Sequence, residues 1–426
     1  MQPTRREFLN LAGGAMLTAG ALAGAGKAAA ANDRIQFAGI GLRSRGWALT
    51  RCAHESGLAD IAALCDVDQK VLEKRAAEVK EMTGKTPRLY QDVRELYADE
   101  GIDAVAIAVP NHWHVLAAIW AMQAGKDVYV EKPISHTIFE GRQLVNAWKK
   151  TGRVVQHGTQ RRSEGPWQRA AERVHAGAIG TPYMARITIF RFREPFNYPF
   201  NESPPEFLDW KLWQGPATEQ AFSRNFVHYN WHWFWHYGNG EIGNNGPHRT
   251  DIVNWVLDKG LPVETASTGG IFGYAEDARE TPNTQVVQHT FADGTLFTID
   301  VRNRHTPSSP STIVLGTEGY MQDTTLYDPD DKVIPDDSPR EAPDNSSVAH
   351  MTNFLKAVQA QDPGAVPATP EQGHVAAALC HLGNIAYRTG RKLRFDPKTE
   401  QFEGDEAANA LLTRQYREGF EVPEIA

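Results

Sequence analysis

The pattern of apolar positions divides the chain into two parts. In the first part, short continuous apolar runs alternate with amphipathic stretches of helical period. Continuous apolar runs suit the strands of a parallel sheet that helices cover on both faces, so this part is predicted to be an α/β domain. The predicted strands are 35–40, 61–65, 88–90, 104–109, 127–130 and 154–157.

In the second part the period changes to alternation. From Tyr183 to Phe192 apolar residues recur at every second position, which predicts a strand with one buried face. Asp293-Gly294 is typical of a hairpin turn, so this part is predicted to be an α+β domain with a mostly antiparallel sheet. Its other predicted elements are strands at 263–272, 284–291, 295–301 and 312–315, a solvated loop at 328–347 and helices within 350–388 that pack back on the first domain.

A glycine turn joins the first strand to a helix. A dinucleotide pyrophosphate needs main-chain N–H groups at a helix N-terminus with no side chain in the way, and Gly39 and Gly41 meet that need. In the pattern G-x-G-x-x-G, the third glycine is replaced by Ser44, which is small enough for close packing of helix and strand, and Gly46 follows. An ordinary strand-to-helix turn is the alternative interpretation.

The second strand ends at Asp66, where a carboxylate can accept hydrogen bonds from the adenosine ribose hydroxyls. A carboxylate there would repel a 2′-phosphate, which favours NAD. Arg43 or Arg45 could soften that preference, so NADP stays an alternative. Asp66 could instead cap the following helix, although Asp68 could also fill that role.

Two later strands also end in polar residues. Ligands of such sheets lie beyond the carboxyl ends of the strands, so Asn111 and His114 are predicted to meet the nicotinamide end of the cofactor, with helix capping as the alternative. Lys132 can donate to a substrate hydroxyl oxygen and lower its pKa as a hydride leaves; a surface lysine is the alternative.

Together, the glycine turn, Cys65-Asp66, the Pro-Asn-His-Trp-His run at 110–114 and Glu131-Lys132-Pro133 resemble the Gfo/Idh/MocA family, named for glucose-fructose oxidoreductase and inositol dehydrogenase. The resemblance covers nearly the whole mature chain. It implies an N-terminal Rossmann domain for NAD or NADP and a C-terminal domain whose large open sheet carries the substrate pocket and often an oligomer interface. A homo-oligomer is therefore expected. The implied cofactor contacts are Gly39, Gly41, Arg43, Ser44, Asp66, Pro110, Asn111, His114, Glu131, Lys132 and Gln160.

The resemblance also implies catalytic residues. In the family, an aspartate and a histidine four residues apart precede a helix, and His248 matches that histidine, with Asp251 as the acid after it. Asn244 stands in the place of the aspartate, and an amide cannot accept a proton as a base. We therefore expect His248 to be the acid/base, Lys132 its electrostatic partner and Asn244 a positioning group. The alternative is that His248 is an N-terminal residue of the helix and has no catalytic role.

Residues 207–237 are dense in aromatic side chains. Flat aromatic faces beside polar donors suit a sugar ring, so Trp231, His232 and Arg249 are the predicted substrate contacts. Packing at a domain or oligomer interface is the alternative. His228, His232 and His236 are four residues apart, but no carboxylate lies among them, and we predict no metal site.

Length and charge limit the function classes. The chain of 426 residues is long enough for two domains, and its net charge of −8 without a basic block argues against nucleic acid as a partner. Three cysteines are too few for a disulfide framework and are predicted to be free core thiols. The expected organisation is a signal peptide at 1–31, a Rossmann domain at 32–160, a substrate-binding and oligomerisation domain at 161–395 and a C-terminal extension at 396–426.

The N-terminus resembles a twin-arginine export signal. Arg5-Arg6 precedes an Ala/Gly/Leu run that is short and glycine-rich for an uncleaved membrane anchor, the alternative, and no other stretch is long enough to span a bilayer. The expected partner is the twin-arginine translocase and the expected location the periplasm. Because a periplasm has no pool of free nicotinamide nucleotide, we predict that the NAD is tightly bound and works in a closed redox cycle.

The predicted function is therefore oxidoreduction of a small carbohydrate with tightly bound NAD. An NAD-dependent glycosidase that works by transient oxidation and elimination is the alternative, because the 41–46 turn and the export signal also resemble those enzymes. The dehydrogenase-type Glu131-Lys132-Pro133 counts against that alternative. A non-catalytic sugar-binding protein is the third hypothesis, and the presence of both Lys132 and His248 counts against it.

Overall fold

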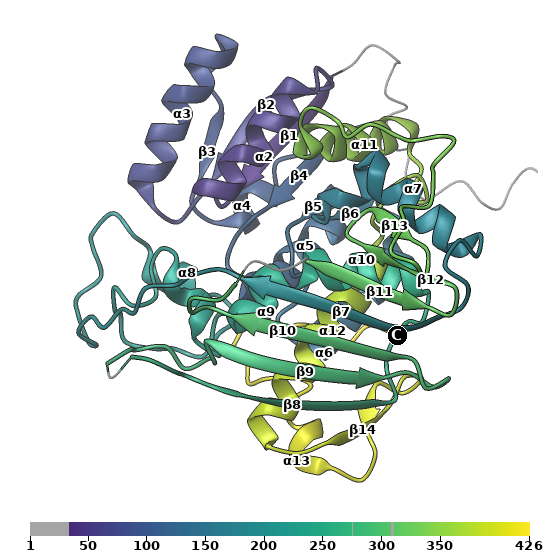
Figure 1. The fold of residues 1–426 in the computed structure, drawn as a ribbon. Helices are drawn as coiled ribbons and strands as arrows, with labels where there is room; N and C mark the ends of the chain where they lie inside the picture. The colour runs from purple at the N-terminus through teal and green to yellow at the C-terminus, as the bar shows by residue number, and fades with distance from the viewer. Residues whose placement is uncertain (1–33, 275, 308–310) are drawn as a thin grey trace, which may run out of the picture. The chain divides into compact units, whose positions relative to one another are not determined.

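The structure is a computed structural model that describes residues 34–274, 276–307 and 311–426 (Figure 1). The predicted twin-arginine signal at 1–31 lies outside the described residues. Among the helices of the described part, none has the length and apolar character needed to cross a membrane.

A six-stranded parallel sheet forms the first part of the fold, in the order β3-β2-β1-β4-β5-β6. This is the strand order of the doubly wound dinucleotide-binding fold, so the predicted Rossmann architecture is confirmed. The strands are β1 Ile35–Ile40, β2 Ala59–Cys65, β3 Arg88–Tyr90, β4 Ala104–Ile107, β5 Asp127–Val130 and β6 Val155–His157. The helices between them are α2 Ser44–Glu55, α3 Gln69–Thr83, α4 Val93–Tyr97, α5 His114–Gln123 and α6 Ile138–Thr151.

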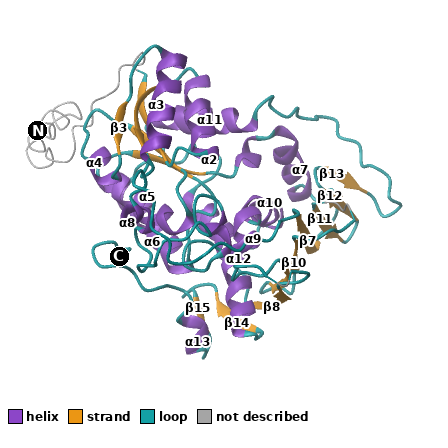
Figure 2. Ribbon diagram, turned by 90° about the vertical axis from the view of Figure 1, so that its left-hand side faces the viewer, coloured by secondary structure: helices purple, strands orange, loops and turns teal. Residues whose placement is uncertain are grey.

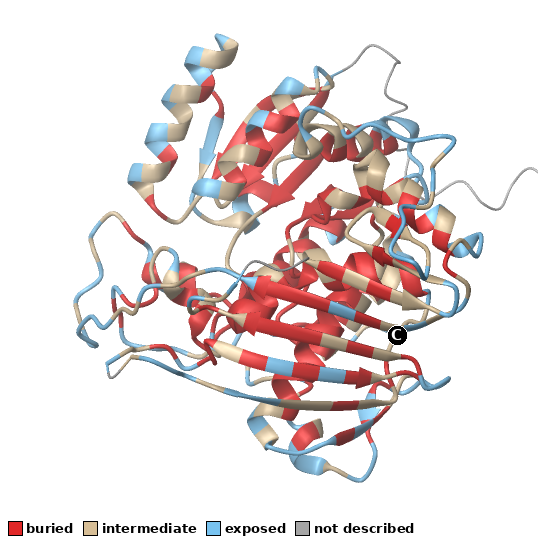
Figure 3. Ribbon diagram, in the orientation of Figure 1, coloured by how far each residue is buried: buried red, intermediate tan, exposed pale blue. Residues whose placement is uncertain are grey.

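Apolar side chains project from both faces of this sheet into hydrophobic cores, which explains the continuous apolar runs in its strands. On one face Ile40 belongs to a core that includes Leu116 of α5 and Leu144 of α6. On the other face Phe37 belongs to a core with Leu49 of α2 and residues of α11 (Ser346–Ala360). The strands other than the edge strand β3 are accordingly mostly buried, as Figure 3 shows, and helix α11 packs against α2.

The second part contains a nine-stranded sheet, in the order β13-β12-β11-β7-β10-β9-β8-β14-β15. Its paired strands are antiparallel except β7 and β10, so the mostly antiparallel sheet is confirmed. Strands β12, β13 and β15 are too short for the alternation to have indicated them. The strands are β7 Pro182–Phe190, β8 Glu264–Gly270, β9 Thr284–Thr290, β10 Leu296–Arg302, β11 Thr312–Gly316, β12 Gly319–Gln322, β13 Thr325–Tyr327, β14 Leu393–Asp396 and β15 Gln401–Phe402.

One face of this sheet is covered by helices α7 (Gly165–His175), α10 (Pro247–Leu257) and α12 (Pro370–Thr389), as Figure 2 shows. Their apolar side chains share a core with the strands, and this core includes Ile187 of β7 and Val253 of α10. None of the described helices covers the opposite face, where Phe190 is exposed. The alternation in the sequence reflects this one-sided burial.

Two segments near the C-terminus pack against the first part of the fold. Helix α12 packs against α6. The residues after α13 (Glu406–Asn409) also reach the first part: Arg414 Nε donates to Glu140 Oε1 at 2.7 Å, and Phe420 meets the ring of Trp113 edge-on. Cys52, Cys65 and Cys380 are buried and free, as expected.

A segment at 205–237, which we call the aromatic strap, crosses the loop after β2. It contains α8 (Trp210–Gln214) and the 3-10 helix η3 (Asn230–Trp233), and its aromatic side chains form a core of their own. Two main-chain hydrogen bonds join it to the loop, from Gln69 N to Phe207 O at 2.8 Å and from Asp209 N to Val67 O at 3.0 Å. The strap thereby lies beside the residues that follow the second Rossmann strand.

Candidate active site

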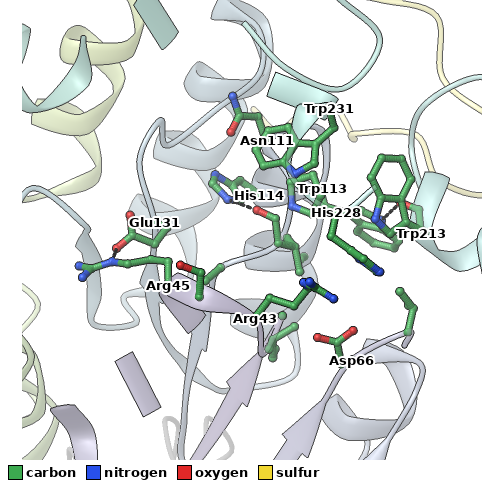
Figure 4. Close-up of a pocket in the computed structure, with 18 of the residues that line it drawn as sticks. Arg43, Arg45, Asp66, Asn111, Trp113, His114, Glu131, Trp213, His228 and Trp231 are labelled. Carbon is green, nitrogen blue, oxygen red and sulfur yellow. Dashed lines mark hydrogen bonds and ion pairs between the residues drawn. The ribbon is translucent and has the colours of Figure 1, made fainter. Parts of the chain in front are cut away.

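A cavity of about 430 Å³ lies beyond the carboxyl ends of β1, β2, β4 and β5 (Figure 4). The aromatic strap, α9 (Gly240–Asn245) and the start of α10 form its other walls. This is where ligands of doubly wound sheets bind. It brings together the predicted residues Gly41, Arg43, Ser44, Asp66, Pro110, Asn111, His114, Glu131, Lys132, Gln160, Trp231, His232, Asn244 and His248.

The glycine turn has the geometry that a pyrophosphate requires. Gly41 has φ +76°, and a Cβ on it would lie 2.7 Å from the main-chain oxygen of Ala108. Gly39 does not line the cavity; a Cβ there would lie 2.4 Å from Thr50 Oγ1 of α2. A Cβ on Gly46 would lie 1.7 Å from Gly41 O. The close-packing role expected of Ser44 is thus filled by Gly46, and Ser44 lines the cavity instead.

Asp66 faces the cavity and does not cap α3. Its carboxylate accepts hydrogen bonds from the main-chain N–H of Leu42 at 2.7 Å and of Asp68 at 3.0 Å. Asp68 caps α3 by accepting from Val71 N at 3.1 Å. Burial raises the pKa of Asp66 to about 6, against the effect of the two N–H donors. The carboxylate is placed as a ribose-binding acid should be, so these residues fit NAD.

Arg45 does not face the ribose end of the cavity. Its Nε lies 2.6 Å from Glu131 Oε1, and Gln160 Nε2 donates to the same oxygen at 3.3 Å (Figure 4). Burial opposes ionisation of Glu131, but Arg45 and Lys132 outweigh it and hold the pKa of that carboxyl below its ordinary value. Glu131 is therefore a paired carboxylate that fixes Arg45 and Gln160 in the cavity wall.

Asn111 and His114 line the cavity, but their polar atoms also bind other parts of the protein. The two ring nitrogens of His114 lie 2.6 Å from Pro133 O and 2.8 Å from Val109 O. Asn111 Nδ2 donates to Asn239 Oδ1 at 2.9 Å. His114 thus holds the loops after β4 and β5 together, and the side-chain oxygen of Asn111 has no hydrogen-bond partner among the described residues.

Lys132 and Asn244 are in direct contact. Lys132 Nζ donates to the main-chain oxygen of Asn244 at 2.6 Å and lies 3.3 Å from its side-chain oxygen. Burial lowers the pKa of Lys132, while Glu131 raises it. Asn244 therefore positions the Lys132 ammonium group. From the sequence alone, Asn244 was expected to position the substrate.

His248 lies one turn further along, at the start of α10, and lines the same cavity. Burial, with the positive charges of Lys132 and Arg161, lowers its pKa well below the ordinary value. His248 is therefore neutral at neutral pH, which leaves a ring nitrogen free to accept a proton, while the same shift makes it a weaker base than an ordinary imidazole. Asp251 is not available for that chemistry, because it lies 2.8 Å from Arg162 Nε in a buried ion pair.

The strap contributes four of the cavity residues that the sequence analysis did not assign. His228 Nε2 lies 3.1 Å from Asp68 Oδ2. Trp231 stacks on His232 with ring centroids 3.6 Å apart, and burial lowers the pKa of His232 to about 3. The aromatic density of the segment was the signal for this wall, although no single position stood out. The unassigned lining residues of the strap are Leu212, Trp213, His228 and Tyr229.

One predicted substrate contact differs from the geometry. Arg249, a predicted substrate contact, is not among the residues that line this cavity. The three strap histidines diverge: His228 lies against Asp68, His232 faces the cavity and His236 Nε2 lies 2.9 Å from Thr218 Oγ1. Within the described residues no group of three His, Cys, Asp or Glu side chains has the arrangement of a metal site.

Both parts of the chain are similar to known proteins. Residues 34–159 match the oxidoreductase family domain described as an NAD-binding Rossmann fold, and residues 186–422 match the C-terminal alpha/beta domain of the same family. The myo-inositol 2-dehydrogenase of Thermotoga maritima is 31% identical over 339 residues, which are 76% of this chain and 89% of that protein. The chain belongs to the Gfo/Idh/MocA family and is an NAD-dependent oxidoreductase.

More distant relatives extend the comparison. A glycosyl hydrolase family 109 protein of Shewanella pealeana is 34% identical over 122 residues, which are 28% of this chain and 26% of that protein. The solved structure of the WlbA dehydrogenase from Bordetella pertussis, in complex with NADH and UDP-GlcNAcA, has a TM-score of 0.64 at 18% identity and covers 85% of this chain and 99% of its own. At 18% identity, this likeness shows a shared fold and nothing more.

Proposed function

We propose that this protein oxidises a CH–OH group of a carbohydrate and transfers the hydride to NAD. The observation that carries the proposal is the convergence of Lys132, Asn244 and His248 on the cavity that also contains the glycine turn and Asp66. A nicotinamide-dependent oxidation needs a base for the hydroxyl proton and a positive charge for the developing alkoxide. The likeness to a myo-inositol 2-dehydrogenase supports a polyhydroxylated ring as substrate.

Each of these residues has one task in the reaction. Neutral His248 accepts the hydroxyl proton, because its lowered pKa leaves the imidazole unprotonated at neutral pH. The Lys132 ammonium stabilises the negative charge that develops on the substrate oxygen, and Asn244 holds the ammonium in place. When bound, NAD supplies the hydride acceptor. Trp231 and His232 offer a flat stacked pair against which the sugar ring can pack.

We further propose that the protein is exported to the periplasm by the twin-arginine translocase and keeps its cofactor through repeated turnovers. The Arg5-Arg6 motif supports export. The strap supports retention, since it lines the cavity and contacts the loop after β2 through His228 and Asp68. A second sugar would then return the hydride, which closes the cycle without free nucleotide.

A homo-oligomer is part of the same proposal. The helix-free face of the nine-stranded sheet exposes Phe190 and Val286, which supports a contact with a second copy. Size-exclusion chromatography with light scattering would measure the mass directly, and a monomeric mass at micromolar concentration would contradict this part of the proposal.

The nucleotide content of the protein as purified tests the central proposal. Protein is prepared from the periplasm with no cofactor added, denatured, and its released nucleotide identified by mass spectrometry. Near-stoichiometric NAD is the expected result. In the native protein, NADH absorbance should then appear when a donor sugar is added and disappear when an acceptor sugar follows. An empty site, with no sugar-dependent signal after NAD is supplied, would favour the third hypothesis, a sugar-binding protein without catalysis.

The NAD-dependent glycosidase remains the second candidate, because the Shewanella pealeana relative is named a glycosyl hydrolase. Such an enzyme would use the same His248 and Lys132 to oxidise a sugar transiently and then return the hydride. Aryl glycosides distinguish the two candidates. Release of the phenol with no net change in bound NAD would establish the glycosidase, whereas net NADH formation without phenol release would establish the dehydrogenase.

A further inference from the structure

The C-terminal tail, residues 410–426, follows α13 and packs on the first part of the fold. Val422 is buried in the core that α5 and α6 form with the six-stranded sheet. Asn146 Nδ2 of α6 donates to Ile425 O at 2.8 Å, and Gln143 Oε1 of the same helix accepts from Ile425 N at 2.7 Å. The last residues of the tail are therefore fixed to α6.

Side chains from two other parts of the chain bind carbonyl groups of α8, the short helix of the aromatic strap. A helix of five residues leaves its last carbonyls without intrahelical partners and is not stable by itself. Arg417 Nη1 of the tail donates to Lys211 O at 2.8 Å. Trp113 Nε1, from the 3-10 helix η1 (Asn111–Trp113), donates to Leu212 O at 3.0 Å. The position of α8 thus depends on the tail and on η1.

The tail and η1 also meet the strap directly after α8. Arg417 N donates to Pro216 O at 3.2 Å, so the tail binds the strap through its main chain as well as through a side chain. Between these two contacts Gly215 has φ +44°, and a Cβ on it would lie 2.0 Å from the Trp113 ring. Helix α8 therefore ends where the strap contacts both Trp113 and the tail.

The tail supports η1 in addition to α8. Arg414 Nη2 donates to His112 O at 2.7 Å, and Phe420 meets the Trp113 ring edge-on with centroids 5.7 Å apart. The Arg417 guanidinium lies over the Phe420 ring, 4.2 Å from its centroid. The residue that binds α8 and the residue that packs on η1 are thus in contact with each other, and the tail, η1 and α8 support one another.

Both supported elements line the cavity. Trp113 of η1 and Leu212 and Trp213 of α8 are lining residues, and Figure 4 shows the two tryptophans beside the cavity. Trp213 belongs to the aromatic core of the strap, against which Val67 packs, and Val67 directly follows the ribose-binding candidate Asp66. This wall therefore lies at the adenosine end. No residue of the tail lines the cavity, so the tail can act on a ligand only through η1 and α8.

We propose that Arg417 is a positioning residue, which holds Leu212 and Trp213 at the adenosine end of the cavity, and that the C-terminal tail thereby sets how long NAD stays bound. This inference rests on the proposed retention of NAD and names the segment that controls it. Loss of the Arg417 contact removes one support of α8, so this wall should open more often and NAD should dissociate faster. The chemistry at Lys132 and His248 should not change.

Dissociation of NADH tests the proposal without a sugar. Bound NADH is chased with excess NAD in a stopped-flow instrument, and the loss of its fluorescence is followed. Arg417→Met keeps most of the side-chain volume but no donor, and should raise the dissociation rate about fivefold or more, as loss of one hydrogen bond would give. Arg417→Lys keeps a charged donor and should return the rate toward the wild-type value. Phe420→Leu, which removes the ring beside Trp113 and Arg417, should also raise the rate.

Two controls distinguish positioning from a general loss of stability. Arg173→Met removes an α7 arginine whose Nη2 donates to Ile334 O at 2.9 Å and to Pro335 O at 2.8 Å, away from the cavity, and should leave the rate unchanged. Isothermal titration of nucleotide-depleted protein with ADP-ribose, which has the adenosine half but no nicotinamide, is the second control. Arg417→Met should weaken ADP-ribose binding by the same factor by which it speeds NADH dissociation.

The outcomes separate this inference from the proposed function. Wild-type dissociation rates in both Arg417→Met and Phe420→Leu would overturn it, and so would an equal increase in Arg173→Met. Faster NADH dissociation with unchanged ADP-ribose affinity would also overturn it, because the tail would then act away from the adenosine end. Failure to oxidise any sugar would contradict the proposed function alone, since none of these measurements uses a sugar.

Discussion

Lys132 Nζ lies 2.6 Å from the main-chain oxygen of Asn244 and 3.3 Å from the side-chain oxygen of the same residue. The shorter contact uses the backbone, which every residue type possesses. The presence of asparagine, where the family resemblance implies an aspartate, therefore leaves the lysine anchored. An amide cannot accept the hydroxyl proton, so the proposed mechanism assigns that step to His248.

The first prediction concerns Lys132 and His248. Lys132→Met and His248→Ala should each lower kcat by about 10²- to 10⁴-fold, the usual contribution of a general base or an electrostatic stabiliser. Bound NAD should remain near the wild-type level, because neither side chain is needed to hold the adenosine end. Turnover and nucleotide content are measured on the same preparation. Normal turnover in either variant would contradict the assigned mechanism.

The second prediction concerns pH. Oxidation needs neutral His248, and its pKa in the folded protein is well below the ordinary value of 6.5, so the base stays available as the pH falls past 6.5. The acid limb of kcat/KM should therefore lie well below pH 6.5, and activity should change little between pH 6.5 and 8 on account of this group. A profile with its acid midpoint at or above pH 6.5 would contradict this prediction, because it would mean that the pKa of His248 is not lowered in the free enzyme.

The third prediction concerns Asp66, whose pKa is raised by burial to about 6. Ribose hydroxyls donate to the ionised carboxylate, so bound NAD should lower this pKa, and binding should release a proton. NAD affinity should then rise with pH by up to about tenfold per unit below pH 6 and level off above about 7. Titration of nucleotide-depleted protein at several pH values measures this slope. Asp66→Asn should bind NAD more weakly and without the slope.

The order of strands and helices could be predicted because burial on both faces leaves continuous apolar runs, whereas burial on one face leaves alternation. The glycine turn, Asp66 and Lys132 could be predicted as cavity residues because each stands at the end of a strand. The contact of His228 with Asp68 could not, since it joins distant segments through a strap without regular period. Nor could Arg162 be expected to pair with Asp251. Such contacts depend on how the two sheets meet.

The fourth prediction concerns retention of the cofactor. His228→Ala removes the contact of the strap with Asp68 at 3.1 Å, and we expect the dissociation rate of NAD to rise about tenfold, as loss of one charge-assisted hydrogen bond would give. Dissociation is followed by chasing bound NADH fluorescence with excess NAD. Thr218→Ala, which removes the contact of His236 with Thr218 elsewhere in the strap, is the control and should leave the rate unchanged.

The last prediction concerns the C-terminal residues. Arg414 Nε donates to Glu140 Oε1 at 2.7 Å, and Arg414 Nη2 donates to His112 O at the same distance, so one side chain joins the chain end to the first part of the fold. Glu140 is fully buried, and among the described residues its other oxygen accepts only from His136 N at 3.2 Å. Arg414→Met would leave that carboxylate without its counter-ion and should cost about 3–5 kcal/mol of unfolding free energy.

Two further variants separate the buried charge from other effects of the substitution. Adding Glu140→Gln to Arg414→Met removes the unpaired charge and should recover part of the loss. Arg391→Met breaks the partly exposed pair with Asp405 and should cost about 1 kcal/mol or less. Urea denaturation of the NAD-loaded protein gives the three free energies. Equal losses in Arg414→Met and Arg391→Met would mean that burial of Glu140 does not control the stability of this contact, and that packing of Phe420 against Trp113 holds the chain end instead.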